Sequence, residues 1–150
     1  MFLNNELAEI KHFIEKYDQK NINVSAKRVD WHLDHSLKVI NGVCGQLKKS
    51  DPSAYQWKFN AIRVFVYTFN FFPRGKGKSP KSVLPPENIL KQDLKNQLDL
   101  AEKELFSIMN LPIKSHFKHP YFGLLNLKKT KKFLKLHTLH HLKICRDIVK

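Results

Sequence analysis

The segment LKKTKKFLKLHTLHHLKICRDIV at residues 127–149 carries an amphipathic helical repeat that strongly constrains the fold. At about 100° per residue, four of its apolar side chains and two of its histidines project from one narrow stripe, while most of its lysines project elsewhere. A helix with such a stripe buries it against neighbouring elements, so we expect both histidines to face the protein interior. The stripe comprises Leu134, His137, His141, Ile144, Cys145 and Ile148.

Further segments with helical periodicity indicate a bundle. Helices are predicted at about residues 4–17, 27–49 and 87–109, in addition to 127–149. Ser25 and Asn126 are of the types that cap helix N-termini, and they precede the second and the last of these helices. The fold class predicted is all-α: an up-and-down four-helix bundle with an additional helical segment and a long crossover loop, forming a single domain over residues 1–150.

The middle of the chain supplies the additional segment and the loop. Residues 55–72, YQWKFNAIRVFVYTFNFF, are rich in aromatic and β-branched side chains but long for one strand, so we expect a buried helix. Its aromatic side chains are expected to line the core and a pocket. Residues 73–86, PRGKGKSPKSVLPP, are rich in Pro, Gly and Lys and predict a loop.

The spacing of His137 and His141 is the main indication of chemistry. Residues four apart in a helix lie on one face, with Cβ atoms about 5–6 Å apart, so both imidazoles can reach one divalent metal ion. A buried imidazole without a partner costs about 1–3 kcal/mol, and no acidic residue shares this stripe to pair with either ring. The HExxH protease signature is absent, because residue 138 is Thr. A satisfied pair of core histidines is the structural alternative.

A third ligand is expected from another helix, and WHLDHS at residues 31–36 offers two histidines. His32 lies nearer the main apolar stripe of its helix, which includes Leu33 and Ile40, whereas His35 lies one turn from Trp31. Helical phase slightly favours His32 but does not decide between the two.

The formal net charge of +14 is unevenly distributed. Residues 31–86 hold nine basic and two acidic residues, and residues 127–150 hold eight basic and one acidic residue. A positive field of this size attracts nucleic acid, anionic lipid or small anionic substrates. A basic helical module that binds nucleic acid without catalytic activity is therefore the alternative function, and lysines that merely solvate outer helix faces are the structural alternative.

The sequence also bears on compartment. No window reaches the 18 apolar residues of a membrane span, and the N-terminus lacks the basic and apolar regions of a signal peptide. Cys44 and Cys145 are far apart and provide no disulfide framework. We therefore expect a cytoplasmic protein with no membrane partner. The sequence GKGKS at residues 75–79 is not a phosphate-binding P-loop, because Phe72 stands where that motif needs Gly.

For several other residues, a functional role competes with a simpler structural interpretation. The basic side chains of the loop could line a pocket mouth and attract an anionic substrate, although a solvated loop is the simpler interpretation. His119, before Pro120, is expected in a turn that fixes the entry of the last helix. Cys145 is expected to pack in the core rather than to ligate a metal ion. The loop cations are Arg74, Lys76, Lys78 and Lys81.

Two motifs give the chain a resemblance to the DinB/YfiT-like superfamily of four-helix-bundle metalloenzymes. They are Trp-x-x-x-His at the start of the second helix, here Trp31 and His35, and His-x-x-x-His on the last helix, here His137 and His141. The segment HPYFGLLN at 119–126 and the HHL at 140–142 resemble an uncharacterised DinB-like subfamily with a His-Pro-x-Phe-Gly-x-Leu segment before a paired-histidine helix. The similarity covers roughly residues 25–150.

The resemblance implies a three-histidine site for zinc, nickel or another divalent metal, with the open coordination positions of a catalytic site. By position, the metal ligands are His35, His137 and His141, which moves the choice of first ligand from His32 to His35. Relatives of this bundle include thiol-dependent S-transferases and hydrolases, so we expect a small-molecule substrate that is anionic or a thiol. Bundles of this type often form homodimers through exposed helical faces.

Overall fold

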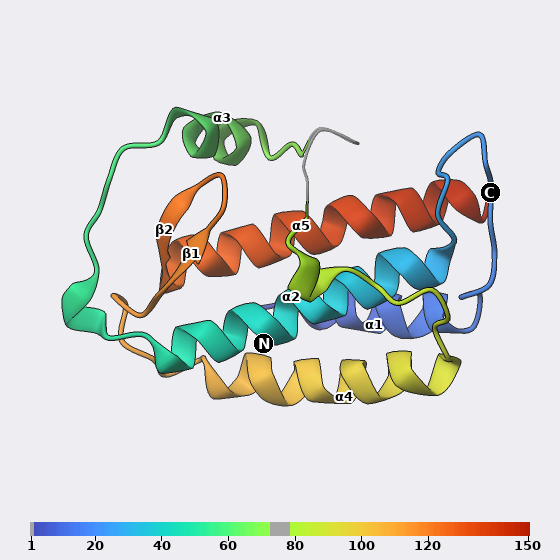
Figure 1. The fold of residues 1–150 in the computed structure, drawn as a ribbon, viewed down its shortest axis with the longest axis horizontal. Coiled ribbons are helices and arrows are strands. Elements are labelled where there is room, and N and C mark those ends of the chain that lie inside the picture. Colours follow the sequence, from blue (N-terminus) through green and yellow to red (C-terminus); the bar gives the residue numbers. More distant parts are fainter. Residues whose placement is uncertain (1, 73–78) are drawn as a thin grey trace.

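The computed structural model describes residues 2–72 and 79–150. Within these residues, four long helices pack together around an apolar core, accompanied by a short helix, two 3₁₀ turns and a β-hairpin (Figure 1). A helical bundle was predicted, and the bounds of its helices lie close to those expected from the sequence. The long helices are α1 (Asn4–Ile14), α2 (Val29–Lys49), α4 (Lys91–Ser107) and α5 (Leu127–Ile148).

The helices do not follow a strict up-and-down order. Helices α2 and α4 run in the same direction, while α1 and α5 run opposite to them (Figure 1). Contacts between α2 and α4 advance in parallel, since the Asn41 side chain donates to the Gln97 carbonyl at 3.2 Å and Lys48 pairs with Glu104 at 2.7 Å. The prediction of an up-and-down bundle was therefore wrong in this respect. The long connection between α2 and α4 returns the chain to the same end of the bundle, which a short loop cannot do.

The core lies along the facing stripes of the four long helices. Leu33, Ile40 and Leu134 are fully buried, and the buried apolar residues of α4 extend from Leu94 to Leu105. Burying each such side chain contributes about 1.5–3 kcal/mol relative to leaving it in water. The apolar stripe of α5 therefore faces inward, as its periodicity predicted, and it carries the histidines inward with it.

Residues 55–72 differ most from the prediction. Only α3 (Ala61–Phe69) is helical within this segment, and it lies outside the bundle (Figure 1). Its buried residues are Arg63 and Val66, whereas Phe65 is 55% exposed. The expected buried helix with a core of phenylalanines was wrong. The exposed aromatic and apolar residues of the segment include Trp57, Phe59, Ile62, Val64, Phe65, Phe69 and Phe71.

Polar contacts attach α3 to the rest of the molecule. The Arg63 guanidinium donates to the carbonyl oxygens of Phe122 and Lys58 at 2.9 and 2.6 Å, and the Tyr67 hydroxyl donates to the Lys129 carbonyl at 2.8 Å. Hydrogen bonds of this kind fix a helix without burying its apolar face. That arrangement explains why hydrophobicity alone misplaced the segment in the core.

The connector before α5 contains an element that the sequence did not predict. Strands β1 (His116–His119) and β2 (Gly123–Asn126) form an antiparallel hairpin, and Gly123 adopts a positive φ of 70° at its turn. His119 Nδ1 accepts hydrogen bonds from the backbone N–H groups of Tyr121 and Phe122 at 3.1 and 3.2 Å. His119 thus takes part in a turn, as predicted, but the turn closes the hairpin, and β2 lies between it and the start of α5. The strands are too short for periodicity to reveal them.

The two predicted N-caps have opposite outcomes. Asn126 Oδ1 accepts from the Lys129 backbone N–H at 3.0 Å and caps α5 as expected. Ser25 does not cap α2, which begins four residues later at Val29, after Arg28 in the cap position. The Ser25 hydroxyl instead accepts from the Lys27 N–H at 3.1 Å and contacts a histidine of α2.

Two further observations bear on the sequence predictions. The 3₁₀ turns are η1 (Pro52–Ala54) and η2 (Lys81–Val83), and η2 lies in the crossover that was predicted to be a loop. The loop cations Arg74, Lys76 and Lys78 lie outside the described residues, while Lys81 is exposed. In the described part of the chain, no helix has both the length and the apolar character needed to cross a bilayer.

Candidate metal centre

Three histidines from two helices converge inside the bundle. His35 of α2 and His137 and His141 of α5 each offer a ring nitrogen, and these nitrogens all lie within 4.8 Å of one another. His35 is 3% exposed and His141 is 8% exposed, while the ring of His137 is half-buried. The structure therefore brings together the three residues that the sequence and the resemblance had singled out.

The spacing of the three nitrogens is close to what one ion requires. Zn–N bonds are about 2.0–2.1 Å long, so two nitrogens that share an ion lie no more than about 4.2 Å apart. The ring centroids of His35 and His137 are 5.1 Å apart, those of His35 and His141 are 4.9 Å apart, and those of the α5 pair are 4.7 Å apart. The nitrogens, which lie within 4.8 Å of one another, are thus close enough to hold a metal ion.

His35 is held by two neighbours. Its Nδ1 lies 2.9 Å from the carbonyl oxygen of Val83, so Nδ1 carries the proton and donates. The lone pair of the neutral ring is then on Nε2. The Trp31 ring stacks on the His35 ring, with centroids 5.2 Å apart and planes at 20°. A backbone carbonyl that receives the second N–H of a ligating histidine is a usual way of fixing its orientation.

His141 is held by a chain of two polar side chains. Its Nδ1 lies 3.1 Å from Nδ1 of His32, and Nε2 of His32 lies 3.1 Å from the Ser25 hydroxyl oxygen. The hydrogen bonds are consistent if Nδ1 of His141 donates to His32 and Nε2 of His32 donates to Ser25. The lone pair of His141 is then on Nε2. His32, which the sequence offered as an alternative ligand, therefore orients the ring of His141 by a hydrogen bond and does not belong to the cluster itself.

His137 has a nitrogen without a protein partner. Its Nδ1 is buried and forms no hydrogen bond within residues 2–72 and 79–150. The ring lies against Phe133 and Phe72, with centroid separations of 5.5 and 6.2 Å. A buried polar atom left unpaired costs about 1–3 kcal/mol, and a metal ion bonded to it would replace the missing partner.

Burial keeps the three rings neutral. It lowers the pKa of His35, and it lowers the pKa values of His137 and His141 well below the usual value of 6.5. For the α5 pair, the positive charge that neighbouring histidines would carry lowers the pKa further. Metal ions bind the neutral form of imidazole, so the cluster is ready to bind a cation at pH 7 without first losing protons.

The remaining histidines and the cysteines lie outside the cluster. His140 contacts Phe72 and His141 by its ring, at centroid separations of 6.0 and 5.0 Å. Cys145 is fully buried in the core, as expected, and burial raises the pKa of its thiol to about 12. His116 and His119 lie in the hairpin. Among the described residues, the cluster of side chains close enough to hold a metal ion consists of histidines and includes no carboxylate.

The residues present fit a divalent cation. Imidazole suits zinc, copper, iron and nickel, whereas magnesium and calcium prefer oxygen ligands. Three protein nitrogens leave a coordination position for water or a substrate, which is the pattern of catalytic zinc sites. Sequence analysis missed the Val83 carbonyl, the Ser25 hydroxyl and Phe72 as neighbours of the cluster. No sequence signal links these residues to the histidines, because Val83 contacts His35 across 48 positions and Phe72 contacts His137 from a separate segment of the chain. Ser25, seven positions before His32, reaches it from a loop outside the helix.

No protein-family model, curated protein or solved structure matches the chain. The fold and the cluster define it as a helical bundle whose three histidines lie close enough to hold a metal ion.

Proposed function

We propose that the protein is a metalloenzyme of the DinB/YfiT-like superfamily that binds one divalent ion through His35, His137 and His141. The proposal rests mainly on the convergence of these three rings, whose nitrogens lie within 4.8 Å of one another. The two sequence motifs that carry the resemblance support it, since all three histidines belong to them. A metal-dependent hydrolase or a thiol-dependent S-transferase is the activity that best suits such a site.

The surroundings of the cluster support a site built for binding. His35 is oriented by Val83 and by Trp31, and His141 is oriented by His32. Outer partners of this kind fix the tautomer of each ligand and raise its basicity. When bound, a divalent ion of this class lowers the pKa of a coordinated water or thiol and so supplies a nucleophile near neutral pH. The chain's own contribution is to hold three neutral nitrogens in one place and to pack the rings of Trp31, Phe72 and Phe133 against the histidines.

Metal analysis of protein purified without a His-tag tests the proposal. We expect close to one divalent ion per chain, and we expect His137→Ala and His141→Ala to lose it. His12→Ala is the matched control, because His12 is exposed on α1, far along the sequence from the cluster. A low metal content that does not fall further in the His137 and His141 variants would contradict the proposal.

Tryptophan fluorescence locates the ion. Trp31 stacks on His35, whereas Trp57 is 60% exposed, so Trp57→Phe leaves one reporter beside the cluster. A paramagnetic ion such as Co(II) or Ni(II) bound at the cluster is expected to quench Trp31 fluorescence in saturable fashion. The same titration of the Trp57→Phe, His141→Ala double variant should show no saturable quenching. Saturable quenching that persists there would place the ion elsewhere. Turnover is then assayed with ester, amide and thiol substrates in the presence of the metal that the protein retains.

A further inference from the structure

A groove of about 1030 Å³ runs beside the histidine cluster, and its described lining comes from the outer face of α5, from residues 70–72 and from Phe2. Its size matches that of pockets that bind small molecules. The groove residues on α5 extend from Lys131 to Lys143, and a rise of about 1.5 Å per residue makes the groove elongated. We call it the α5 groove. Its apolar lining is formed by Phe2, Phe71, Phe72, Leu136 and Leu139.

The polar side chains of the α5 groove are predominantly cationic. Lys131, Lys132, Lys135 and Lys143 line it, together with Asn70 and His140, and no carboxylate belongs to the described lining. Lys132 donates to the Tyr67 carbonyl at 2.8 Å, and Lys135 lies 3.6 Å from Glu6. Lys131 and Lys143 form no ion pair with any described residue. The groove thus combines an apolar lining with an uncompensated positive charge.

The α5 groove adjoins the candidate metal centre through two side chains. Phe72 lines the groove, and its ring lies 6.2 Å from the ring of His137. His140 also lines it, and its ring lies 5.0 Å from the ring of His141. A molecule in the groove would therefore lie one side chain away from the cluster.

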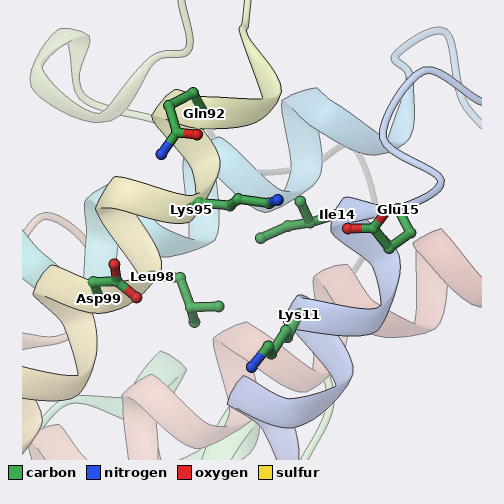
Figure 2. Close-up of a pocket in the computed structure, with 7 residues that line it drawn as sticks. All are labelled: Lys11, Ile14, Glu15, Gln92, Lys95, Leu98 and Asp99. Carbon is green, nitrogen blue, oxygen red and sulfur yellow. The ribbon is translucent and has the colours of Figure 1, made fainter.

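A second pocket provides a contrast. It has a volume of about 300 Å³ and lies between α1 and α4, where Lys95 extends toward Ile14 (Figure 2). Its two lysines, Lys11 and Lys95, share it with Glu15 and Asp99, so its charges balance. The charges lining that pocket favour neither an anionic nor a cationic ligand, whereas the charged side chains in the described lining of the α5 groove are all positive.

From this combination we infer that the α5 groove binds the substrate of the metal centre, and that this substrate is a small amphiphilic anion. The lysines would receive its acidic head, and the phenylalanine and leucine side chains would receive its apolar body. The substrate role rests on the proposed function of the cluster. Any such ligand has an anionic head group on an apolar chain. The head group can be a carboxylate or a phosphate, and the experiment must distinguish these two.

Calorimetric titration of the full-length, metal-free protein with decanoate tests the binding step. We expect saturable binding that weakens as salt is added, because exposed charge contacts are screened. Decyl phosphate in place of decanoate shows which head is preferred. Decanol, which lacks the charge, and acetate, which lacks the chain, are expected to bind at least about tenfold more weakly.

Variants separate the charge from the apolar lining. Replacing Lys131 and Lys143 together with Gln should weaken decanoate binding about tenfold, since two exposed charge contacts are removed without leaving an unpaired acid. Lys49→Gln with Lys103→Gln removes the same charge from helices outside the groove and should leave binding unchanged. Leu136→Asp, at a half-buried position, should abolish binding, and circular dichroism checks that this variant remains helical.

Several results would overturn the inference. One is the absence of saturable decanoate binding to the wild-type protein, and another is binding of decanol as tight as that of decanoate. A third is a loss of decanoate affinity in the Lys49 and Lys103 control variant as large as that in the Lys131 and Lys143 variant. The last is binding of the protein to anionic vesicles but not to monomeric decanoate. The substrate role requires that decanoate also perturb the visible spectrum of the Co(II)-loaded protein over the same concentration range, and an unchanged spectrum would refute that role. If Co(II) fails to bind at all, the proposed function fails, whereas the metal-free titration still reports on the groove by itself.

Discussion

The Nδ1 atoms of His32 and His141 lie 3.1 Å apart, although 109 positions separate the two residues in the sequence. This contact joins the first turn of α2 to the last turns of α5 and orients the ring of His141 within the histidine cluster. His32 is therefore best understood as a positioning residue beside the proposed ligands, and its removal should have a smaller effect than the removal of a ligand.

We expect His32→Ala to weaken metal binding about 10- to 100-fold, the usual effect of losing an outer partner of a ligating histidine. His141→Ala should abolish binding at the same metal concentrations. Competition against a chelator of known affinity measures both. His32→Gln retains a hydrogen-bond acceptor and should recover part of the loss. Equal loss in His32→Ala and His141→Ala would instead make His32 a ligand.

The pH dependence of stability offers a test away from the cluster. Burial lowers the pKa of His119 to about 4, while the unfolded chain titrates near the usual value of 6.5. Between these values the unfolded state binds the proton and the folded state does not, so the free energy of unfolding falls as pH decreases from about 6.5 to about 4. We expect about 1–2 kcal/mol from this group between pH 7 and pH 5, allowing for the part of its ring that water reaches.

Urea unfolding of wild type and His119→Asn at pH 7 and pH 5 measures this contribution. The Asn side chain retains an acceptor for the Tyr121 and Phe122 N–H groups but does not titrate. The variant should therefore lose less stability than the wild type between the two pH values. Protonation of the buried histidines of the cluster lowers stability in the same direction in both proteins, so equal losses would show that His119 is not among the groups that couple folding to protons in this range.

The cap of α5 should contribute measurably to stability. Asn126→Ala removes the acceptor of the Lys129 N–H, which is expected to cost about 1 kcal/mol. For a domain of this size, that loss corresponds to a decrease of about 2–4 °C in Tm. Asn126→Asp keeps the cap and should stay within about 1 °C of the wild type on the same scale. A thermal unfolding series followed by circular dichroism at 222 nm makes the comparison, and a decrease in the Asp variant as large as that in the Ala variant would exclude the cap as the cause.

Substitutions on the exposed face of α3 should have little effect on stability. Phe65 is 55% exposed, so Phe65→Ser should change the free energy of unfolding by no more than about 0.5–1 kcal/mol. Leu134→Ala, at a fully buried position of α5, should cost about 2–5 kcal/mol. Chemical denaturation of both variants distinguishes this fold from the buried helix that the sequence predicted. A loss of several kcal/mol in Phe65→Ser would indicate that α3 packs into a core.

The success of the sequence predictions follows the strength of the local signal. Helix α5 was predicted almost to the residue because its stripe repeats over six turns and Asn126 marks its start. Helix α3 was misjudged because hydrophobicity was taken as burial, although Arg63 and Tyr67 attach the helix through polar contacts. The hairpin was missed because four-residue strands carry too few positions for a period to be recognised.

The candidate site shows the same division. Local periodicity alone placed His137 and His141 on one inward face of α5, because residues four apart necessarily share a face of a helix. It could not choose between His32 and His35, since both lie near the apolar stripe of α2 and three positions at about 100° each leave them only about 60° apart around the helix axis. Packing of α2 against α5 separates the two: it brings His35 into the cluster and places His32 beside it, in contact with His141. Likewise, helix α5 by itself carries the four lysines of the groove, but only the tertiary structure set Phe2, Phe71 and Phe72 beside them to form an apolar groove next to the histidines. The physical reason is that backbone geometry fixes which residues share a face, whereas the angle and register between helices depend on contacts made across the whole chain.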